Sequence, residues 1–237
     1  MTQLALITGG SRGIGYAIAE KFATMGFNLI LIAQNDTRLL SAKHALQHIN
    51  SNIHIDTLAI DFTDSSAVEQ AAKALSKANP NINILVNSAG VLSIEFEHAS
   101  AATLTSLFSI NCISTMILTN AIAAQMKEYR TGHIINIASL AGKSHLPKIG
   151  VYAATKAALI SYSESLYKSL LPYDVKVSCL CPSVVNTEMT NDGRIANQDK
   201  IQTDDIVNAI TFILSLGKGA QLPQLDIDCT PIALTQL

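Results

Sequence analysis

The 237-residue chain has no tryptophan, only 5% aromatic residues and only 14% charged residues, whereas 49% of it is hydrophobic. Its formal net charge is −2, so it lacks the concentrated positive charge that nucleic acids and anionic lipid surfaces attract. No uninterrupted apolar run approaches the ~18–20 residues needed to cross a bilayer. We therefore expect a globular chain that buries one substantial core and has no nucleic-acid or membrane partner.

Cysteines are few and do not follow the spacing of a metal or redox motif. The four are Cys112, Cys179, Cys181 and Cys229. Without a Cys-x-x-Cys or zinc pattern, we expect no metal site, and we expect free thiols in a reducing cytoplasm. The opening M-T-Q-L-A-L-I-T has no basic segment or cleavage site, which favours a first strand over a signal peptide.

Apolar runs alternate with helical patterns along nearly the whole chain. The predicted strands are Leu4–Thr8, Asn28–Ala33, Ile53–Ile60, Ile84–Asn87, His133–Ser139, Lys176–Cys181 and Leu225–Ile227, and the predicted helices are 13–26, 36–49, 64–78, 99–128, 151–171 and 203–216. Most strands are continuously apolar, as expected when helices cover both faces of a parallel sheet. The pattern predicts one α/β domain, 1–237, with a doubly wound seven-stranded parallel sheet. The polar segment 186–202 is expected to be a mobile substrate loop.

A glycine-rich turn follows the first predicted strand. In T-G-G-S-R-G-I-G, it contains Gly9, Gly13 and Gly15 immediately before the first helix. Glycine lets the backbone turn tightly and approach a ligand, and the helix N-terminus offers N–H groups to a pyrophosphate. The spacing is G-x-x-x-G-x-G rather than the general G-x-G-x-x-G. Its position nevertheless predicts a dinucleotide site.

The end of the second strand bears on the choice of nicotinamide cofactor. An acidic residue there would bind the ribose 2′-OH of NAD, whereas a nearby arginine accommodates the 2′-phosphate of NADP. Here the position holds Ala33 and Gln34, and Arg12 can supply positive charge. Asp36 opposes this interpretation unless it caps the next helix. We therefore predict that NADP(H) is favoured over NAD(H).

Tyr152 and Lys156 stand four residues apart in a predicted helix, which places both on one face. A free phenol has a pKa of ~10 and is protonated at neutral pH, and a neighbouring cation favours its ionised form. An isolated Y-x-x-x-K is usually two ordinary surface residues. Only the motifs around it make this pair a candidate for proton transfer.

Six motifs occur together in one order along the chain. They are T-G-G-S-R-G-I-G, N-S-A-G, S-I-N, I-N-I-A-S, Y-A-A-T-K and C-P-S-V-V-N-T. In order and approximate spacing they resemble the short-chain dehydrogenase/reductase family over essentially the whole chain, and most closely its 3-oxoacyl-carrier-protein reductases. The resemblance implies a single-domain Rossmann fold, hydride transfer between a nicotinamide and a carbonyl or alcohol, and a homodimer or homotetramer.

The resemblance also implies roles for individual residues. Tyr152 would exchange a proton with the substrate oxygen, and Lys156 would favour its ionised form and hold the nicotinamide ribose. Ser139 would donate a hydrogen bond to the substrate carbonyl. Asn111 would position a water that connects Lys156 to solvent, and Thr187 would contact the nicotinamide carboxamide.

The cofactor site implied by the family is larger. It comprises Gly9, Ser11, Arg12, Gly13, Ile14, Gly15, Gln34, Asp61, Phe62, Asn87, Ala89, Gly90, Tyr152, Lys156, Pro182, Val185 and Thr187. Asp61 would accept from the adenine amino group, and the Val185 backbone would hold the carboxamide. Three departures weaken any substrate assignment by analogy: N-S-A-G replaces N-N-A-G, Ser183 replaces a glycine after Pro182, and D-I-D-C-T-P replaces a glycine-rich ending.

Two alternatives remain open. A non-catalytic NADP-binding regulator could share the fold, although such proteins can lose the tyrosine or lysine that this chain keeps. A sugar-nucleotide epimerase or dehydratase usually has a longer region after the position of Thr187. The substrate pocket is expected along 91–99, 142–150 and 186–202, where Ile94, Leu146 and Met189 favour a partly apolar ligand.

Overall fold

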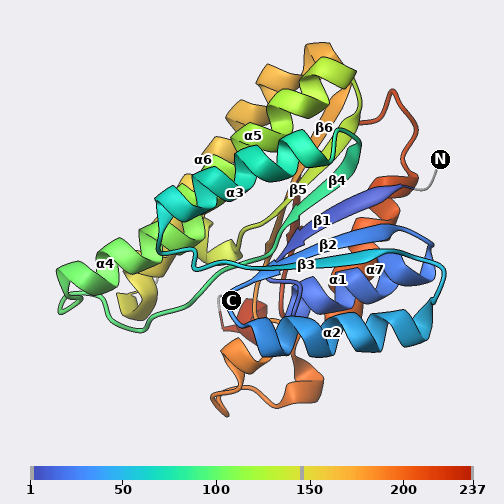
Figure 1. Ribbon diagram of the computed structural model, residues 1–237. Helices are drawn as coiled ribbons and strands as arrows, with labels where there is room; N and C mark the ends of the chain where they lie inside the picture. Colours follow the sequence, from blue (N-terminus) through green and yellow to red (C-terminus); the bar gives the residue numbers. More distant parts are fainter. Residues whose placement is uncertain (1–2, 145–146, 236–237) are drawn as a thin grey trace.

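The computed structural model describes residues 3–144 and 147–235, which form one seven-stranded sheet of order β3-β2-β1-β4-β5-β6-β7 (Figure 1). Every neighbouring pair of strands is parallel. The strands are β1 (Leu4–Thr8), β2 (Asn28–Ala33), β3 (Ile55–Ala59), β4 (Ile82–Asn87), β5 (Gly132–Ile137), β6 (Val175–Pro182) and β7 (Gln224–Ile227). The predicted doubly wound fold is confirmed.

Helices cover both faces of this sheet (Figure 1). Helices α1, α2 and α7 lie on one face, and α3, α5 and α6 lie on the other. The helices are α1 (Gly13–Thr24), α2 (Asp36–Ile49), α3 (Ser65–Ala78), α4 (Ala101–Phe108), α5 (Ser114–Tyr129), α6 (Gly150–Leu170), α7 (Thr203–Ser215) and α8 (Thr230–Leu234). Element boundaries differ from the sequence prediction by a few residues. The predicted strand Ile53–Ile60, for example, is shortened to the five residues that pair with β2.

The continuous apolar character of the strands reflects two core layers. Successive strand side chains point to opposite faces. Leu6 packs with Leu118 on the α5 side, whereas Ile7 packs with Phe22 and Ile210 on the side of α1 and α7. Because both faces are covered, neither set of positions can be polar at low cost.

The segment Ala101–Tyr129 is a continuous helix in which a π turn, Ser109–Ile113, joins α4 to α5. Among the described residues it is the one helix that length and composition would allow to span a membrane, with a mean hydropathy of 1.6 over its best window. More than half of that window, 56%, is buried inside the molecule. A core helix of a globular protein meets the same criterion, and α5 packs on α3 and the sheet.

The direction of winding reverses beside β1. The chain builds β2 and β3 on one side of β1 and then crosses to place β4 on the other side. The turns that follow β1 and β4 therefore diverge and leave a crevice at the carboxyl edge. The Thr8 hydroxyl accepts the N–H groups of Ser88 and Ala89, both at 3.1 Å, and so fixes one turn against the other.

A buried histidine links strands β5 and β6. His133 Nε2 lies 3.0 Å from Ser178 Oγ, which in turn donates to the Leu222 carbonyl at 2.7 Å. Since that Ser178 proton is committed, His133 is the donor in the first contact. Burial, with a smaller contribution from Lys176, lowers the pKa of His133 to about 4. The imidazole is therefore neutral in the folded protein at pH 7.

We expect His133 to make the fold sensitive to acid. Between pH 6.5 and 4 the unfolded chain binds a proton at this position that the folded chain does not, so stability falls as pH falls. The full loss is about 3 kcal/mol, because the pKa of about 4 in the folded protein lies well below the ordinary value of 6.5. Urea unfolding of the wild type and His133→Gln at pH 7.5, 6.0, 5.0 and 4.5 measures this. The wild type should lose more stability than the variant across the series, and parallel pH profiles would contradict the assignment.

Candidate functional site

A cavity of about 330 Å³ lies in the crevice at the carboxyl edge of the sheet. Its walls include many of the residues that the sequence predicted for the cofactor: Gly9, Ser11, Arg12, Gly13, Ile14, Gln34, Asp61, Phe62, Ala89, Gly90 and Thr187. Residues that the sequence analysis did not select also contribute, namely Asn35, Arg38, Ser88, Ile110 and Glu188. The predicted site residues thus converge on one hollow from five separate stretches of chain.

The glycine turn allows α1 to begin directly beneath this cavity. Gly9 has φ +69°, and a Cβ there would lie 3.0 Å from the Ala89 nitrogen. A Cβ at Gly15 would lie 2.4 Å from the Gly9 carbonyl oxygen, so only glycine permits the helix to approach the strand so closely. No side chain caps the N-terminus of α1, at Arg12. Its first N–H groups are available to an anionic ligand.

Two arginines, Arg12 and Arg38, line the cavity. Asn35 Oδ1 accepts the Arg38 N–H at 2.8 Å and caps α2, so the prediction that Asp36 is the cap is wrong. Asn35 is the last residue with extended backbone, and Asp36 is already the first helical residue. This register places Arg38 on the cavity wall beside Arg12. The sequence analysis did not identify Arg38 as a cavity residue, although an asparagine that can cap a helix stands three residues before it.

Asp61 lines the cavity between the ends of β2 and β3. Hydrogen bonds from the Thr63 N–H and hydroxyl, both at 2.8 Å, lower its pKa, with a smaller contribution from Gln34. The carboxylate therefore stays ionised at neutral pH and keeps acceptor capacity for a ligand. Phe62, which is buried, contributes an apolar surface beside it.

Tyr152 and Lys156 lie side by side on α6. Lys156 is only 5% exposed, and its ammonium donates to the Ile137 carbonyl at 3.0 Å, at the end of β5. Lys156 Nζ also lies 5.7 Å from the centroid of the Tyr152 ring. The four-residue spacing brings the cation and the phenol together as expected.

Ser139 follows β5 and connects it to β6. Its hydroxyl accepts the Ala141 N–H at 3.1 Å and donates to the Pro182 carbonyl at 3.3 Å. The next residue, Ser183, donates its N–H to Ile227 at 2.8 Å, and its backbone is outside the left-handed region. The serine that replaces a glycine after Pro182 is therefore accommodated without strain.

Asn111 lies in the π turn between α4 and α5. Its Oδ1 accepts the Val91 N–H at 2.9 Å, while its Nδ2 donates to the Val91 carbonyl at 2.9 Å and to Thr155 Oγ1 at 3.0 Å. A Cβ at Gly90 would lie 3.3 Å from Asn111 Oδ1 and 3.5 Å from Lys156 Nζ. Asn111 and Lys156 thus both lie close behind Gly90, which lines the cavity, and the water-relay role of Asn111 stays a prediction. Widened helical turns of this kind are frequent at functional sites.

Several predicted cofactor residues lie outside the cavity wall. They are Gly15, Asn87, Tyr152, Lys156, Pro182 and Val185. The Asn87 side chain points into the core, where Nδ2 donates to Thr119 Oγ1 and Asn136 Oδ1, both at 2.8 Å. Asn136 continues the chain of contacts to Ser163 at 2.8 Å. Asn87 therefore braces the strands beneath the site.

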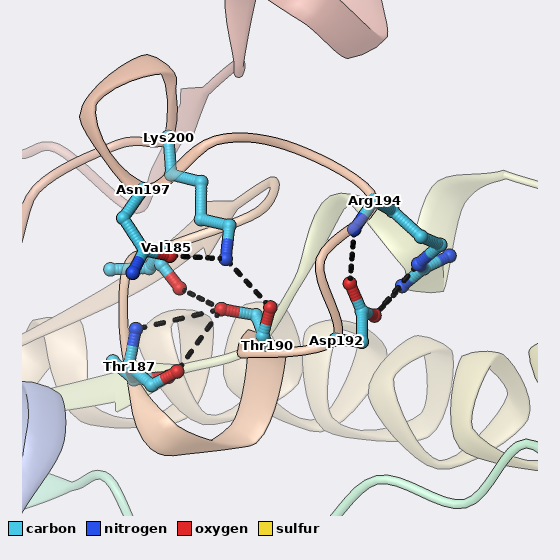
Figure 2. Close-up of polar contacts among 7 residues, drawn as sticks. All are labelled: Val185, Thr187, Thr190, Asp192, Arg194, Asn197 and Lys200. Carbon is cyan, nitrogen blue, oxygen red and sulfur yellow. Dashed lines mark hydrogen bonds and ion pairs between the residues drawn. The ribbon is translucent and has the colours of Figure 1, made fainter.

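The segment predicted as a mobile loop is tied together internally (Figure 2). Val185 forms a β-bridge with Ile201, and the Thr190 hydroxyl donates to the Val185 carbonyl at 2.5 Å. Lys200, only 5% exposed, donates to the Thr190 carbonyl at 2.7 Å and to Asn197 Oδ1 at 2.9 Å. The turn that carries Thr187 is thereby held against the cavity. Nothing in the polar composition indicated that this lysine would be buried.

Of the residues expected to favour an apolar substrate, one lines the cavity and another is largely exposed to solvent. Met189 lines the cavity, whereas Ile94 is 77% exposed. Leu146 lies outside the described residues. Among the residues that the structure describes, no group of three or more His, Cys, Asp and Glu side chains is arranged to hold a metal ion.

Comparison with known proteins agrees with this geometry. The family model for short-chain dehydrogenases matches residues 3–198. An uncharacterized oxidoreductase of Staphylococcus saprophyticus is 31% identical over 213 residues, covering 90% of this chain and 91% of that protein.

Two solved structures are similar over nearly the whole chain. One is a β-ketoacyl-ACP reductase from Bacteroides thetaiotaomicron, with a TM-score of 0.85, 28% identity and coverage of 99% of both chains. The other is a metagenomic short-chain oxidoreductase in complex with NADP, with a TM-score of 0.82, 28% identity and coverage of 95% of this chain and 96% of that one. The chain belongs to the short-chain dehydrogenase/reductase family of oxidoreductases.

Proposed function

We propose that the protein is an NADP(H)-dependent enzyme that interconverts a carbonyl compound and an alcohol, with Tyr152 as the acid/base. One observation carries the proposal. The cavity is lined both by the glycine turn and by Gly90, and Gly90 lies beside the buried ammonium of Lys156, which neighbours the phenol of Tyr152. The hollow and the candidate proton-transfer pair are therefore separated only by the backbone around Gly90.

The residues of the cavity suit a nicotinamide dinucleotide. The free N–H groups of α1 would hold the pyrophosphate, Arg12 and Arg38 would hold a 2′-phosphate, and Thr187 would lie toward the nicotinamide. A side chain at Gly9 would press on the Ala89 nitrogen at 3.0 Å, and one at Gly90 on Asn111 Oδ1 at 3.3 Å, so glycine at both positions lets the wall of the cavity pack closely. When bound, the nicotinamide supplies or accepts the hydride.

The chain's own groups would manage the proton and the charge on the substrate oxygen. Tyr152 would give its hydroxyl proton to that oxygen during reduction and recover one from it during oxidation. The Lys156 ammonium, fixed on the Ile137 carbonyl, would stabilise the phenolate that results. Ser139 would turn its hydroxyl from the long 3.3 Å contact with Pro182 toward the substrate oxygen.

A 3-oxoacyl thioester is the proposed substrate class. The resemblance of the motifs and the likeness to a β-ketoacyl-ACP reductase support it. Met189 and Val91 on the cavity wall add apolar surface that an acyl chain would contact.

We further propose a cytoplasmic homodimer or homotetramer. Four large apolar side chains on or beside α4, α5 and α6 are well exposed, namely Leu104, Ile113, Tyr129 and Leu171. The four cysteines are buried free thiols, as suits a reducing compartment. Light scattering should give two or four times the chain mass of 25.3 kDa, and a monomeric mass would contradict the assembly.

Tyr152→Phe tests the catalytic assignment. Loss of the only proton-transfer hydroxyl should lower kcat for NADPH-dependent carbonyl reduction by about 10²–10⁴-fold, with little change in NADPH affinity. The assay follows nicotinamide absorbance over a carbonyl panel that includes a 3-oxoacyl thioester. Tyr162→Phe is the matched control, since Tyr162 lies on the same helix and its phenol bonds Asn120 at 2.8 Å.

Full turnover in Tyr152→Phe would remove Tyr152 from the mechanism. Tight NADPH binding by the wild type without turnover of any panel member would instead favour a non-catalytic regulator of the same fold.

Arg12→Ala and Arg38→Ala test the coenzyme assignment. Each removes one charged donor to the 2′-phosphate, so each should weaken NADPH binding by about tenfold or more and leave NADH binding unchanged. Titration calorimetry measures both coenzymes. Arg194→Ala, which removes an exposed arginine outside the cavity wall, is the control. Equal losses for NADH and NADPH would show that the arginines do not select the phosphate.

A further inference from the structure

The carboxylate of Glu188 forms ion pairs with both arginines of the cavity wall, Arg12 and Arg38. Glu188 Oε2 pairs with Arg12 Nη1 and lies 3.2 Å from Arg38 Nη1. The three side chains come from the glycine turn, from α2 and from the segment after β6, so the contact spans distant parts of the sequence. The hydrogen bond from Arg12 and the charge of Arg38 lower the pKa of Glu188, which is therefore ionised at neutral pH.

The backbone that presents Glu188 is held in place. Glu188 lies in the short turn Glu188–Thr190, whose last residue is fixed by the buried ammonium of Lys200 and by the Val185 carbonyl (Figure 2). The carboxylate is itself at the surface, with 61% of the side chain exposed. Displacement of Glu188 from the arginines therefore requires rotation of one side chain and no unfolding of the loop.

We infer that Glu188 is an internal competitor for the 2′-phosphate of the coenzyme and thereby sets the selectivity between NADP(H) and NAD(H). This inference rests on the proposed use of NADP(H). Two guanidinium groups facing one carboxylate form a seat for a single anionic group of similar size and hydrogen-bonding geometry. A carboxylate and a phosphate cannot both occupy it without close repulsion between like charges.

The competition acts on one coenzyme only. A phosphate monoester carries a charge of about −1.5 to −2 at pH 7, against −1 for Glu188, so the phosphate displaces the carboxylate. NAD(H) has a neutral ribose hydroxyl at this position and leaves the ion pairs intact. Glu188 thus lowers the affinity for NADP(H) without a corresponding effect on NAD(H). When NADP(H) departs, the carboxylate can return to the arginines.

Glu188→Gln tests the inference in the full-length protein. Exposed ion pairs are individually weak, so removal of the competing charge should tighten NADPH binding by about two- to tenfold. The fragment 2′,5′-ADP, which carries the 2′-phosphate without the nicotinamide, should gain by the same factor, and NADH should not gain. Asp192→Asn is the matched control, because it removes one charge from the same loop but Asp192 pairs with Arg194.

The double variant Arg12→Ala/Arg38→Ala supplies the second measurement. In that background Glu188→Gln should no longer tighten NADPH binding, because the two guanidinium groups for which the carboxylate and the phosphate compete are absent. Wild-type NADPH binding with no gain, or a loss, in Glu188→Gln would overturn the inference and leave the proposed function standing. Failure of the wild type to bind NADPH or 2′,5′-ADP would overturn both. If Asp192→Asn tightened NADPH binding as much as Glu188→Gln does, the effect would come from the overall charge of the loop, and Glu188 would not be a specific competitor.

Discussion

The site depends on the contact between two turns at the reversal point of the sheet. The Thr8 hydroxyl accepts two N–H groups from the turn after β4, and the absence of a side chain at Gly9 lets that turn come within van der Waals distance. A crevice at this point follows from the winding alone, since crossovers to opposite sides of β1 separate the following segments. The hydroxyl and the glycine give the crevice a definite shape, and Gly90 then lies next to Lys156.

The cavity joins two kinds of local structure with different demands. Exposed, charged side chains line the cavity itself: Arg12, Arg38 and Glu188. Behind its wall at Gly90 are buried groups held by hydrogen bonds, namely Lys156 on the Ile137 carbonyl and Asn111 on Val91 and Thr155. Binding of a charged group suits the first environment, because the side chains adjust at low cost. Proton transfer suits the second, because its geometry cannot relax when charge develops.

The sequence was sufficient for features that repeat or that demand one residue type. Continuous apolar strands predicted the sheet and both of its helical layers, and the glycines at 9, 13 and 15 predicted the turn. The helical period placed Tyr152 on the same face as Lys156. These inferences succeeded because each depends on local geometry, which is set by a few neighbouring residues.

Other features depend on contacts between distant segments, and the sequence did not reveal them. Arg38 lies on the cavity wall in a register in which Asn35, and not Asp36, caps α2. Asn87 resembles a cofactor residue by motif, yet its side chain bonds Thr119 and Asn136 in the core. Lys200 lies in a polar stretch but is buried beneath the loop. In each case tertiary packing determines the environment of a polar side chain, and its local sequence does not.

The π turn at Ser109–Ile113 has a further geometric consequence for the long helix that contains it. One surplus residue rotates everything after it by about 100° relative to an unbroken α-helix, at 3.6 residues per revolution. The stretch before it and the stretch after it can thus present independent faces, that of α4 to α6 and that of α5 to the sheet. Asn111 lies within the π turn, so the direction of its side chain does not have to follow the helical period that packs α5 into the core.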